Sequence, residues 1–232
     1  MKTVICAGPP TSGKTTVLRQ VARRLIAAGH RLAYLKIDVL FADEDEVFAR
    51  EFGIPARKVY SGDLCPDHCS VMVLGEALEW AEGLGSDFLL VETAGLCLRC
   101  SPYIENALGI VVLEATSGMN LPRKIGPMLS LADIAVVTKI DLISQAEREV
   151  FRANINEAAK VVIIESDALH GINIDHLVAR IKVAPDTQEP LLLRGNPPVG
   201  TCTICVGKKE IGWKRHFGVV RPLSGDLFYR GE

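Results

Sequence analysis

The stretch GPPTSGKT, residues 8–15, has the residue types and the spacing of a phosphate-binding loop. A short apolar run precedes it and a helical pattern follows it, and this context disfavours a chance glycine turn. Backbone amides at a helix N-terminus donate to phosphate oxygens, a lysine adds a positive charge, and a threonine hydroxyl can bind Mg2+. The residues expected to contact the phosphates and the metal are Gly8, Ser12, Gly13, Lys14, Thr15 and Thr16.

Two acidic residues at the ends of apolar runs are candidates to hold the same Mg2+ ion. Glu92 ends the run FLLVE, and Gly95 follows three residues later, as in the second acidic motif and the switch turn of nucleotide hydrolases. Asp38 closes the run LAYLKID and could hold the metal or position a catalytic water. The alternative reading of Glu92 is a carboxylate that caps the following loop. We expect Lys14, Asp38 and Glu92 to form the catalytic set.

The run IAVVTKIDL, residues 134–142, has the position and pattern of a guanine-reading motif. In such a motif the carboxylate of Asp141 accepts hydrogen bonds from N1 and N2 of guanine, which adenine does not offer in that arrangement, and the stem of Lys139 lies along the base. The usual first residue is Asn, whereas this chain has Thr138. An ordinary polar strand exit is the alternative, because Lys-x-Asp is a common triplet. The pattern favours GTP as the nucleotide.

Six of the seven cysteines form close pairs, namely Cys65 with Cys69, Cys97 with Cys100, and Cys202 with Cys205. Paired thiolates suit zinc, copper(I) or an iron–sulfur cluster better than hard cations. His68 lies between two of them and could complete a mixed sulfur–nitrogen site for nickel or zinc. In a reducing compartment such pairs indicate metal or cluster binding, although a structural zinc site in the tail or unliganded buried thiols remain alternatives. Cys6, in the first apolar run, is expected to be a small buried hydrophobe.

Apolar runs and helical patterns alternate along the first 185 residues. Strands are predicted at residues 3–6, 32–37, 88–91, 110–113, 134–137 and 161–164, and helices at 15–28, 71–81, 145–159 and 174–181. This alternation predicts an α/β fold of the P-loop NTPase type, with a mostly parallel sheet and helices on both faces. Residues 186–232 are rich in Pro and Gly and lack a long periodic segment. We therefore expect a GTPase domain at 1–185 and a small irregular, basic, Cys-containing extension at 186–232.

The overall charge of −2 gives no reason to expect a nucleic acid or an acidic membrane as a partner. No secretory-type segment opens the chain and no apolar run is long enough to span a membrane, so the expectation is a soluble, cytoplasmic protein.

Residues 206–221 carry five Lys or Arg and one Glu with Trp213 and Phe217 interleaved. This segment could form a solvated basic face or a docking surface for a partner or an acidic ligand. Binding of nucleic acid is a third interpretation, which only the local charge favours. The run 43–46, DEDE, reads as the acidic first turn of a helix.

Taken in order, these stretches resemble the nickel-accessory GTPases, which are the hydrogenase and urease maturation proteins of the P-loop metallochaperone class. The resemblance covers about residues 1–182 and includes GDLCPDHCSVMVLGEAL, LLVETAGLCLRCSP, the segment 110–142 and ESDALHGINIDHLVARI. It implies metal binding at a nucleotide-dependent dimer interface by Cys65 or Cys69 with His68, and by Cys97 or Cys100. The second thiol of each pair, the absence of a His-rich segment and the tail with Cys202 and Cys205 depart from the family, so the metal could differ from nickel.

The resulting hypothesis is a GTP-hydrolysing metallochaperone or metalloenzyme maturation factor. It would work as a homodimer, use Mg2+, carry Zn2+ or Ni2+, and meet a client metalloenzyme or its accessory proteins. The alternative from another class is a P-loop iron–sulfur protein in which Cys97 and Cys100 of two subunits bridge a cluster and nucleotide gates electron transfer or cluster delivery. A small-molecule kinase is a third reading, which leaves the thiols beside the switch turn unexplained.

Overall fold

The structure is a computed structural model that describes residues 1–39, 42–61, 66–95, 100–196, 209–211, 219–220 and 227–230, with only the backbone of 67, 68, 219, 220 and 227–230. The strands are β1 (Lys2–Ala7), β2 (Leu32–Asp38), β3 (Ala56–Tyr60), β4 (Phe88–Thr93), β5 (Leu108–Glu114), β6 (Ile134–Thr138), β7 (Val162–Glu165), β8 (Val219–Val220) and β9 (Leu227–Arg230). The helices are α1 (Lys14–Ala27), α2 (Glu44–Phe52), α3 (Pro66–Gly83), α4 (Leu121–Lys124), α5 (Pro127–Ser130), α6 (Gln145–Ala158) and α7 (Ile174–Lys182), with short 3-10 turns η1 (Ala115–Ser117) and η2 (Ile140–Leu142). Within these ranges no helix is both long and apolar enough to cross a membrane.

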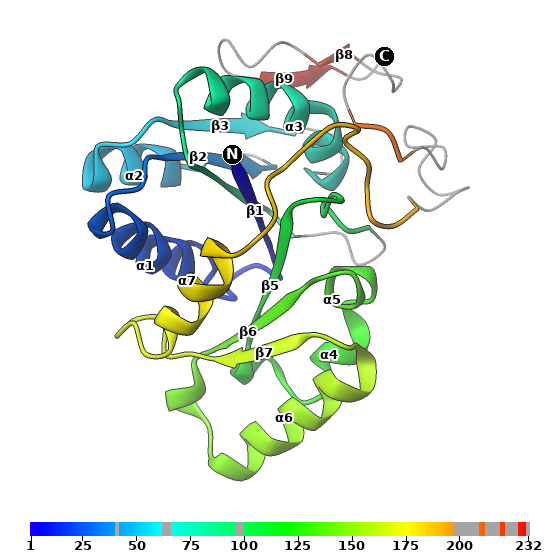
Figure 1. Cartoon of the computed structure of the whole chain (residues 1–232). Helices are drawn as coiled ribbons and strands as arrows, with labels where there is room; N and C mark the ends of the chain where they lie inside the picture. Colours follow the sequence, from blue (N-terminus) through cyan, green and yellow to red (C-terminus); the bar gives the residue numbers. More distant parts are fainter. Residues whose placement is uncertain are drawn as a thin grey trace.

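The strands form one sheet in the order β7-β6-β5-β1-β4-β2-β3-β9-β8 (Figure 1). All neighbouring pairs from β7 to β9 are parallel, and β8 pairs with β9 in the antiparallel sense. Because parallel strands share one direction, the loops after β1, β2, β4 and β6 leave the same edge of the sheet, where ligands bind in open α/β folds. The predicted α/β P-loop architecture is confirmed.

Alternate residues of the strands divide the core into two layers, as the two-residue period of a strand requires. Val4 and Cys6 of β1 face the layer beneath α1, α2 and α7, whereas Ile5 and Ala7 face the layer beneath α3, α5 and α6. Both layers are almost fully buried, and each large aliphatic side chain in them contributes roughly 1.5–3 kcal/mol of burial free energy. The helices therefore cover both faces, which fixes the sheet edge that carries the site.

The predicted strands and long helices match observed elements within a few residues, and α2 begins at Glu44 within the acidic run. The short strands β3, β8 and β9 and the short helices α4 and α5 were not predicted. β9 extends the sheet beside β3, so part of the tail has regular structure where an irregular extension was expected.

Residues 191–194 form a ribbon against the folded core. They lie antiparallel to 103–105 on one side, through the Ile104 to Leu193 bridge, and to 209–211 on the other, through Leu192 to Glu210. Leu193 is buried in the core, and the guanidinium of Arg194 donates to the carbonyls of Ile104 and Leu131 at 3.0 Å each. The first residues after 185 are thus tied to the sheet domain.

Candidate functional site

The phosphate loop connects β1 to α1 and has glycines at two positions that disfavour a side chain, one because of a clash and one because of its backbone conformation. A Cβ on Gly8 would lie 2.3 Å from the carbonyl oxygen of Val112, and Gly13 caps α1 with a left-handed φ of 92°. Thr11 is also left-handed, with φ of 63°. A Cβ on Gly95 would lie 1.9 Å from the carbonyl oxygen of Gly8, so the turn after β4 packs directly on the loop. The loop and the turn are therefore in direct backbone contact.

Lys14 begins α1 and bends back over the loop. Its ammonium donates to the carbonyl oxygens of Gly8 at 2.9 Å and Pro9 at 3.0 Å, and the residue is 8% exposed. Burial lowers the pKa of this amine. The contacts show a lysine whose charge is directed into the hollow of the loop, where phosphate oxygens would offer stronger acceptors than carbonyls do.

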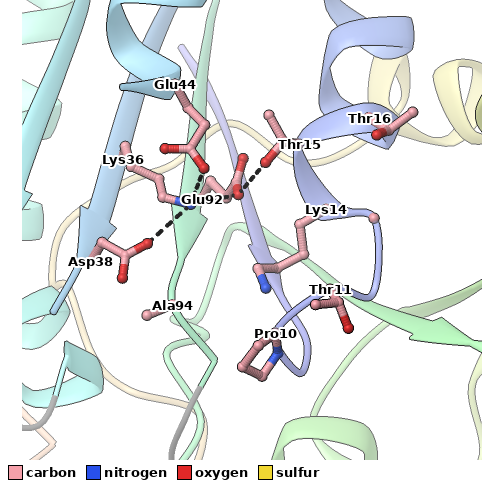
Figure 2. Close-up of a pocket in the computed structure, with 11 residues that line it drawn as sticks. Pro10, Thr11, Lys14, Thr15, Thr16, Lys36, Asp38, Glu44, Glu92 and Ala94 are labelled. Carbon is pink, nitrogen blue, oxygen red and sulfur yellow. Dashed lines mark hydrogen bonds and ion pairs between the residues drawn. The ribbon is translucent and has the colours of Figure 1, made fainter. Parts of the chain in front are cut away.

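Thr15 and Glu92 meet across the edge of the sheet (Figure 2). The Thr15 hydroxyl donates to Oε1 of Glu92 at 2.8 Å, and Glu92 is 1% exposed at the end of β4. Two side chains of β2 hold the same carboxylate: the Tyr34 hydroxyl donates to Oε2 at 2.8 Å, and the Lys36 ammonium to Oε1 at 2.7 Å. The structure thus brings together two of the expected metal-site residues, Thr15 and Glu92. It also shows that Tyr34 and Lys36, which were not predicted from the sequence, hold the Glu92 carboxylate.

Lys36 joins Glu92 to two further carboxylates. Its Nζ lies 3.3 Å from Oδ2 of Asp38 and 3.3 Å from Oε1 of Glu44, at the start of α2. Asp38, the third expected member, therefore lies beside the same site, and Glu44 was missed. The sequence does contain a signal for Lys36. It is a charged residue within the mainly apolar run LAYLKID, and in a strand it lies on the same face as Tyr34 and Asp38.

These groups line a cavity of about 370 Å3 with residues from the loop, β2, α2 and β4 (Figure 2). The donor set fits Mg2+, which takes hydroxyl, carboxylate and phosphate oxygens. In the described part of the chain, this cavity included, no group of three His, Cys, Asp or Glu side chains is arranged to hold a metal ion. The three carboxylates here surround the Lys36 ammonium instead.

A second cavity, of about 340 Å3, lies on the other side of the loop. It is lined by Gly13, Thr16, Thr138, Lys139, Asp141, Leu142, Asp167, Ala168 and Leu169. Gly13 and Thr16 line both cavities, so a single ligand could run from one to the other along the start of α1. The residues expected to read the base therefore lie beside those expected to hold phosphate. Residues 167–169 were not assigned a role from the sequence; their place after β7 on the same sheet edge is the signal that could have found them.

Thr138 occupies the position where the guanine motif usually has Asn, and its hydroxyl contacts the phosphate loop. Oγ1 donates to the carbonyl oxygen of Ser12 at 2.6 Å, and the residue is 2% exposed. Lys139 is left-handed and forms an ion pair with Glu114. Burial opposes ionisation of Glu114, but hydrogen bonds from Lys139 and Ser117 lower its pKa below the ordinary value. These contacts fix the loop and Lys139 beside the second cavity.

The expected thiol sites are described only in part. Cys69 lies on α3 inside the core, 1% exposed, and burial raises the pKa of its thiol to about 12. Cys100 is half-buried, and Cys6 is a buried member of the core, as expected. Cys65, Cys97, Cys202, Cys205 and the side chain of His68 lie outside the described residues. Whether the pairs converge on one ion stays a prediction.

Residues 2–164 match the family described as CobW/HypB/UreG, nucleotide-binding domain. An uncharacterized protein of Methanocaldococcus jannaschii is 45% identical over the whole of both chains, and urease accessory protein UreG 2 of Streptomyces griseus is 33% identical over 73% of this chain and 81% of its own.

Among solved structures, HypB from Helicobacter pylori in complex with nickel superposes with a TM-score of 0.59 at 20% identity, covering 82% of this chain and 91% of that one. At this identity the likeness shows the fold. The family match shows more, because residues 2–164 include the phosphate loop, the acidic strand end and the Thr138 strand. The chain belongs to the CobW/HypB/UreG family.

Proposed function

We propose that this protein is a GTP-hydrolysing metallochaperone or maturation factor, in which nucleotide state controls metal binding by Cys and His residues beside the switch turn. One observation carries the nucleotide part of the proposal: Gly13 and Thr16 line both the phosphate cavity and the cavity of Lys139 and Asp141. A nucleoside triphosphate can lie across them with its phosphates at Lys14 and its base at Asp141.

Hydrolysis needs charge stabilisation and alignment more than covalent chemistry. Water adds to the γ-phosphorus, the bond to the bridging oxygen breaks, and GDP, inorganic phosphate and a proton leave. Lys14 and the loop amides stabilise the charge on the phosphates. Thr15 and Glu92 would hold Mg2+, which would supply further positive charge to the triphosphate. Asp38 organises the metal or positions the water, since its carboxylate lies at the same cavity.

Base recognition rests on Asp141 and on the position of Lys139. Both line the second cavity, where the apolar side chains of Leu142 and Leu169, 65% and 75% exposed, flank the entrance. A carboxylate accepts from N1 and N2 of guanine but finds no matching pair of donors on adenine. Discrimination of this kind, by a polar group that the wrong ligand leaves unpaired, is strong.

Coupling to metal rests on the contact between Gly95 and Gly8. A change at the γ-phosphate that moves the loop also moves this turn, and residues 97–100 follow it directly. Metal affinity at Cys97 and Cys100, with Cys65, His68 and Cys69, would then depend on the nucleotide. The similarity to a urease accessory protein and to HypB in complex with nickel supports nickel as the bound ion. Zinc is the other ion that suits Cys and His ligands. We further propose a homodimer that closes around the ion, and a client metalloenzyme or its accessory proteins as partners.

The domain division follows the same proposal, with the GTPase at 1–185 and a distinct extension at 186–232. The extension carries Cys202 and Cys205 and the whole basic segment 206–221, most of which lies outside the described residues. The ribbon at 191–194 would anchor this extension to the GTPase core.

GTP turnover tests the nucleotide part. Lys14→Ala should abolish hydrolysis, and Asp141→Asn should move the preference from GTP towards xanthosine triphosphate, because the amide offers a donor where the carboxylate offered an acceptor. An Asp141→Asn variant with unchanged base preference would contradict the assignment of this cavity.

Metal and acid-labile sulfide content of protein purified without oxygen tests the cargo. About one zinc or nickel per dimer supports the metallochaperone, whereas about four irons and four sulfides per dimer support the iron–sulfur alternative. Cys97→Ser should retain GTP binding and lose metal-dependent dimerisation. Equal dimerisation of this variant and the wild type, with and without metal, would refute the coupling.

A further inference from the structure

The ammonium of Lys36 lies where three carboxylates of the phosphate cavity converge (Figure 2). Nζ is 2.7 Å from Glu92, 3.3 Å from Asp38 and 3.3 Å from Glu44, and the side chain is 4% exposed. The three acids come from three separate elements: the end of β4, the end of β2 and the start of α2. Lys36 is therefore the cation that neutralises this group of acids in the structure.

The Glu92 carboxylate has donors on both oxygens. Oε1 accepts from Thr15 and Lys36, and Oε2 accepts from Tyr34. Thr15, one of the proposed magnesium ligands, uses its hydroxyl proton in this contact. The Thr15 oxygen keeps its lone pairs for a metal ion, but a divalent ion that arrives alone must approach the resident positive charge of Lys36 at short range.

We propose that Lys36 is a positioning residue that serves as the counter-ion of the magnesium carboxylates while no nucleotide is bound, so that a divalent cation enters only together with the triphosphate. The inference rests on the proposed function, since it concerns the same Mg2+ site.

The electrostatics of the cavity support this role. Three carboxylates within 3.3 Å of Nζ stabilise the ammonium form of Lys36. Charges interact more strongly at a buried edge than in water, and a divalent ion beside an ammonium is disfavoured there. The triphosphate changes the balance because it brings several negative oxygens that are themselves magnesium ligands. Lys36 can then remain on Asp38 and Glu44 while Glu92 turns to the metal.

The same contacts link the metal to the segment between β2 and α2. Asp38 and Glu44 flank residues 39–43, and Lys36 is the group that bridges them. Oε2 of Glu44 is buried and has no hydrogen-bond partner among the described residues, so this carboxylate can accept a further donor. A shift of Lys36 away from Glu92 would strengthen its contact with α2.

Titration of nucleotide-free protein with Mn2+, followed by electron paramagnetic resonance, tests the inference. Mn2+ prefers oxygen ligands, so the cysteines do not compete for it. Wild type should leave Mn2+ free until GTP is added. Lys36→Met, which removes the charge and keeps a long side chain, should bind Mn2+ without nucleotide at least about tenfold more tightly, because the like charge nearest the site is gone.

Lys58→Met is the matched control. Lys58 also pairs with two acids of α2, at 3.7 Å from Asp45 and 3.4 Å from Glu46, but it does not line the cavity. This variant should behave as wild type. The inference is overturned if Lys36→Met binds Mn2+ no more tightly than Lys58→Met, or if nucleotide-free wild type already binds Mn2+ tightly.

Lys36→Met leaves three acids without their cation and could unfold, so a second variant is needed. Lys36→Met combined with Glu44→Gln preserves the net charge and should also gain Mn2+ binding and a rise in melting temperature with Mn2+ alone. GTP binding by wild type separates the two proposals. If wild type binds no GTP, the proposed function fails; if it hydrolyses GTP while the Lys36 variants gain no Mn2+ affinity, only the role of Lys36 fails.

Discussion

Thr138 should determine how well the phosphate loop is held, and Thr138→Val isolates its hydroxyl because the two side chains have nearly the same shape. The hydroxyl donates to the Ser12 carbonyl at 2.6 Å, and both residues are buried. Loss of the donor leaves a buried carbonyl unpaired, which costs about 1–3 kcal/mol. For a domain of this size that lowers the melting temperature by roughly 2–4 °C per kcal/mol.

The affinity for GTP gives the second measurement. If the loop loosens in the free protein and GTP binding restores it, the same free energy limits the loss of affinity to about 5- to 150-fold. Calorimetric titration with GTP and a thermal melt of the free protein measure both quantities. Thr138→Ser keeps the oxygen and should stay near wild type in each. Identical behaviour of the Val and Ser variants would refute the reasoning, since the hydroxyl would then not position the loop.

Three further outcomes are expected. Arg194→Ala removes the guanidinium that ties residues 191–194 to the core, where it also contacts Asp133 at 2.7 Å. The variant should lower the denaturant midpoint by the equivalent of about 2–4 kcal/mol. A change within error would show that the ribbon contributes little to stability. Tyr34→Phe leaves one Glu92 oxygen without its donor and should lower the melting temperature by several degrees; an unchanged melt would mean that another group replaces it. Glu114→Gln should reduce the free energy of unfolding near neutral pH by under about 1 kcal/mol. The lowered pKa of Glu114 stabilises the fold above the ordinary value of 4.5, so the stability difference between variant and wild type should disappear as the pH falls below 4.5. A stability difference that persists at lower pH would contradict the role of the ion pair between Glu114 and Lys139.

The sequence alone determined the parts of this protein that depend on local pattern. The phosphate loop was recognisable because its glycines and Lys14 lie within eight residues, and each strand around it was recognisable from apolar runs of ordinary length. Glu92 was assigned to the end of an apolar run and Asp141 to the exit of another, and the structure has Glu92 in β4 and Asp141 in the turn after β6.

Only the tertiary structure decided which distant residues meet. Lys36 joins Glu92 because β2 pairs with β4 in a register that sets Lys36 opposite Glu92, and no local pattern encodes a register between strands more than fifty residues apart. The burial of Cys69 in the core likewise depends on how α3 packs against the sheet. Local periodicity fixes which face of an element is apolar, whereas pairing and packing choose its neighbours, so the elements were predictable and the charged network inside the site was not.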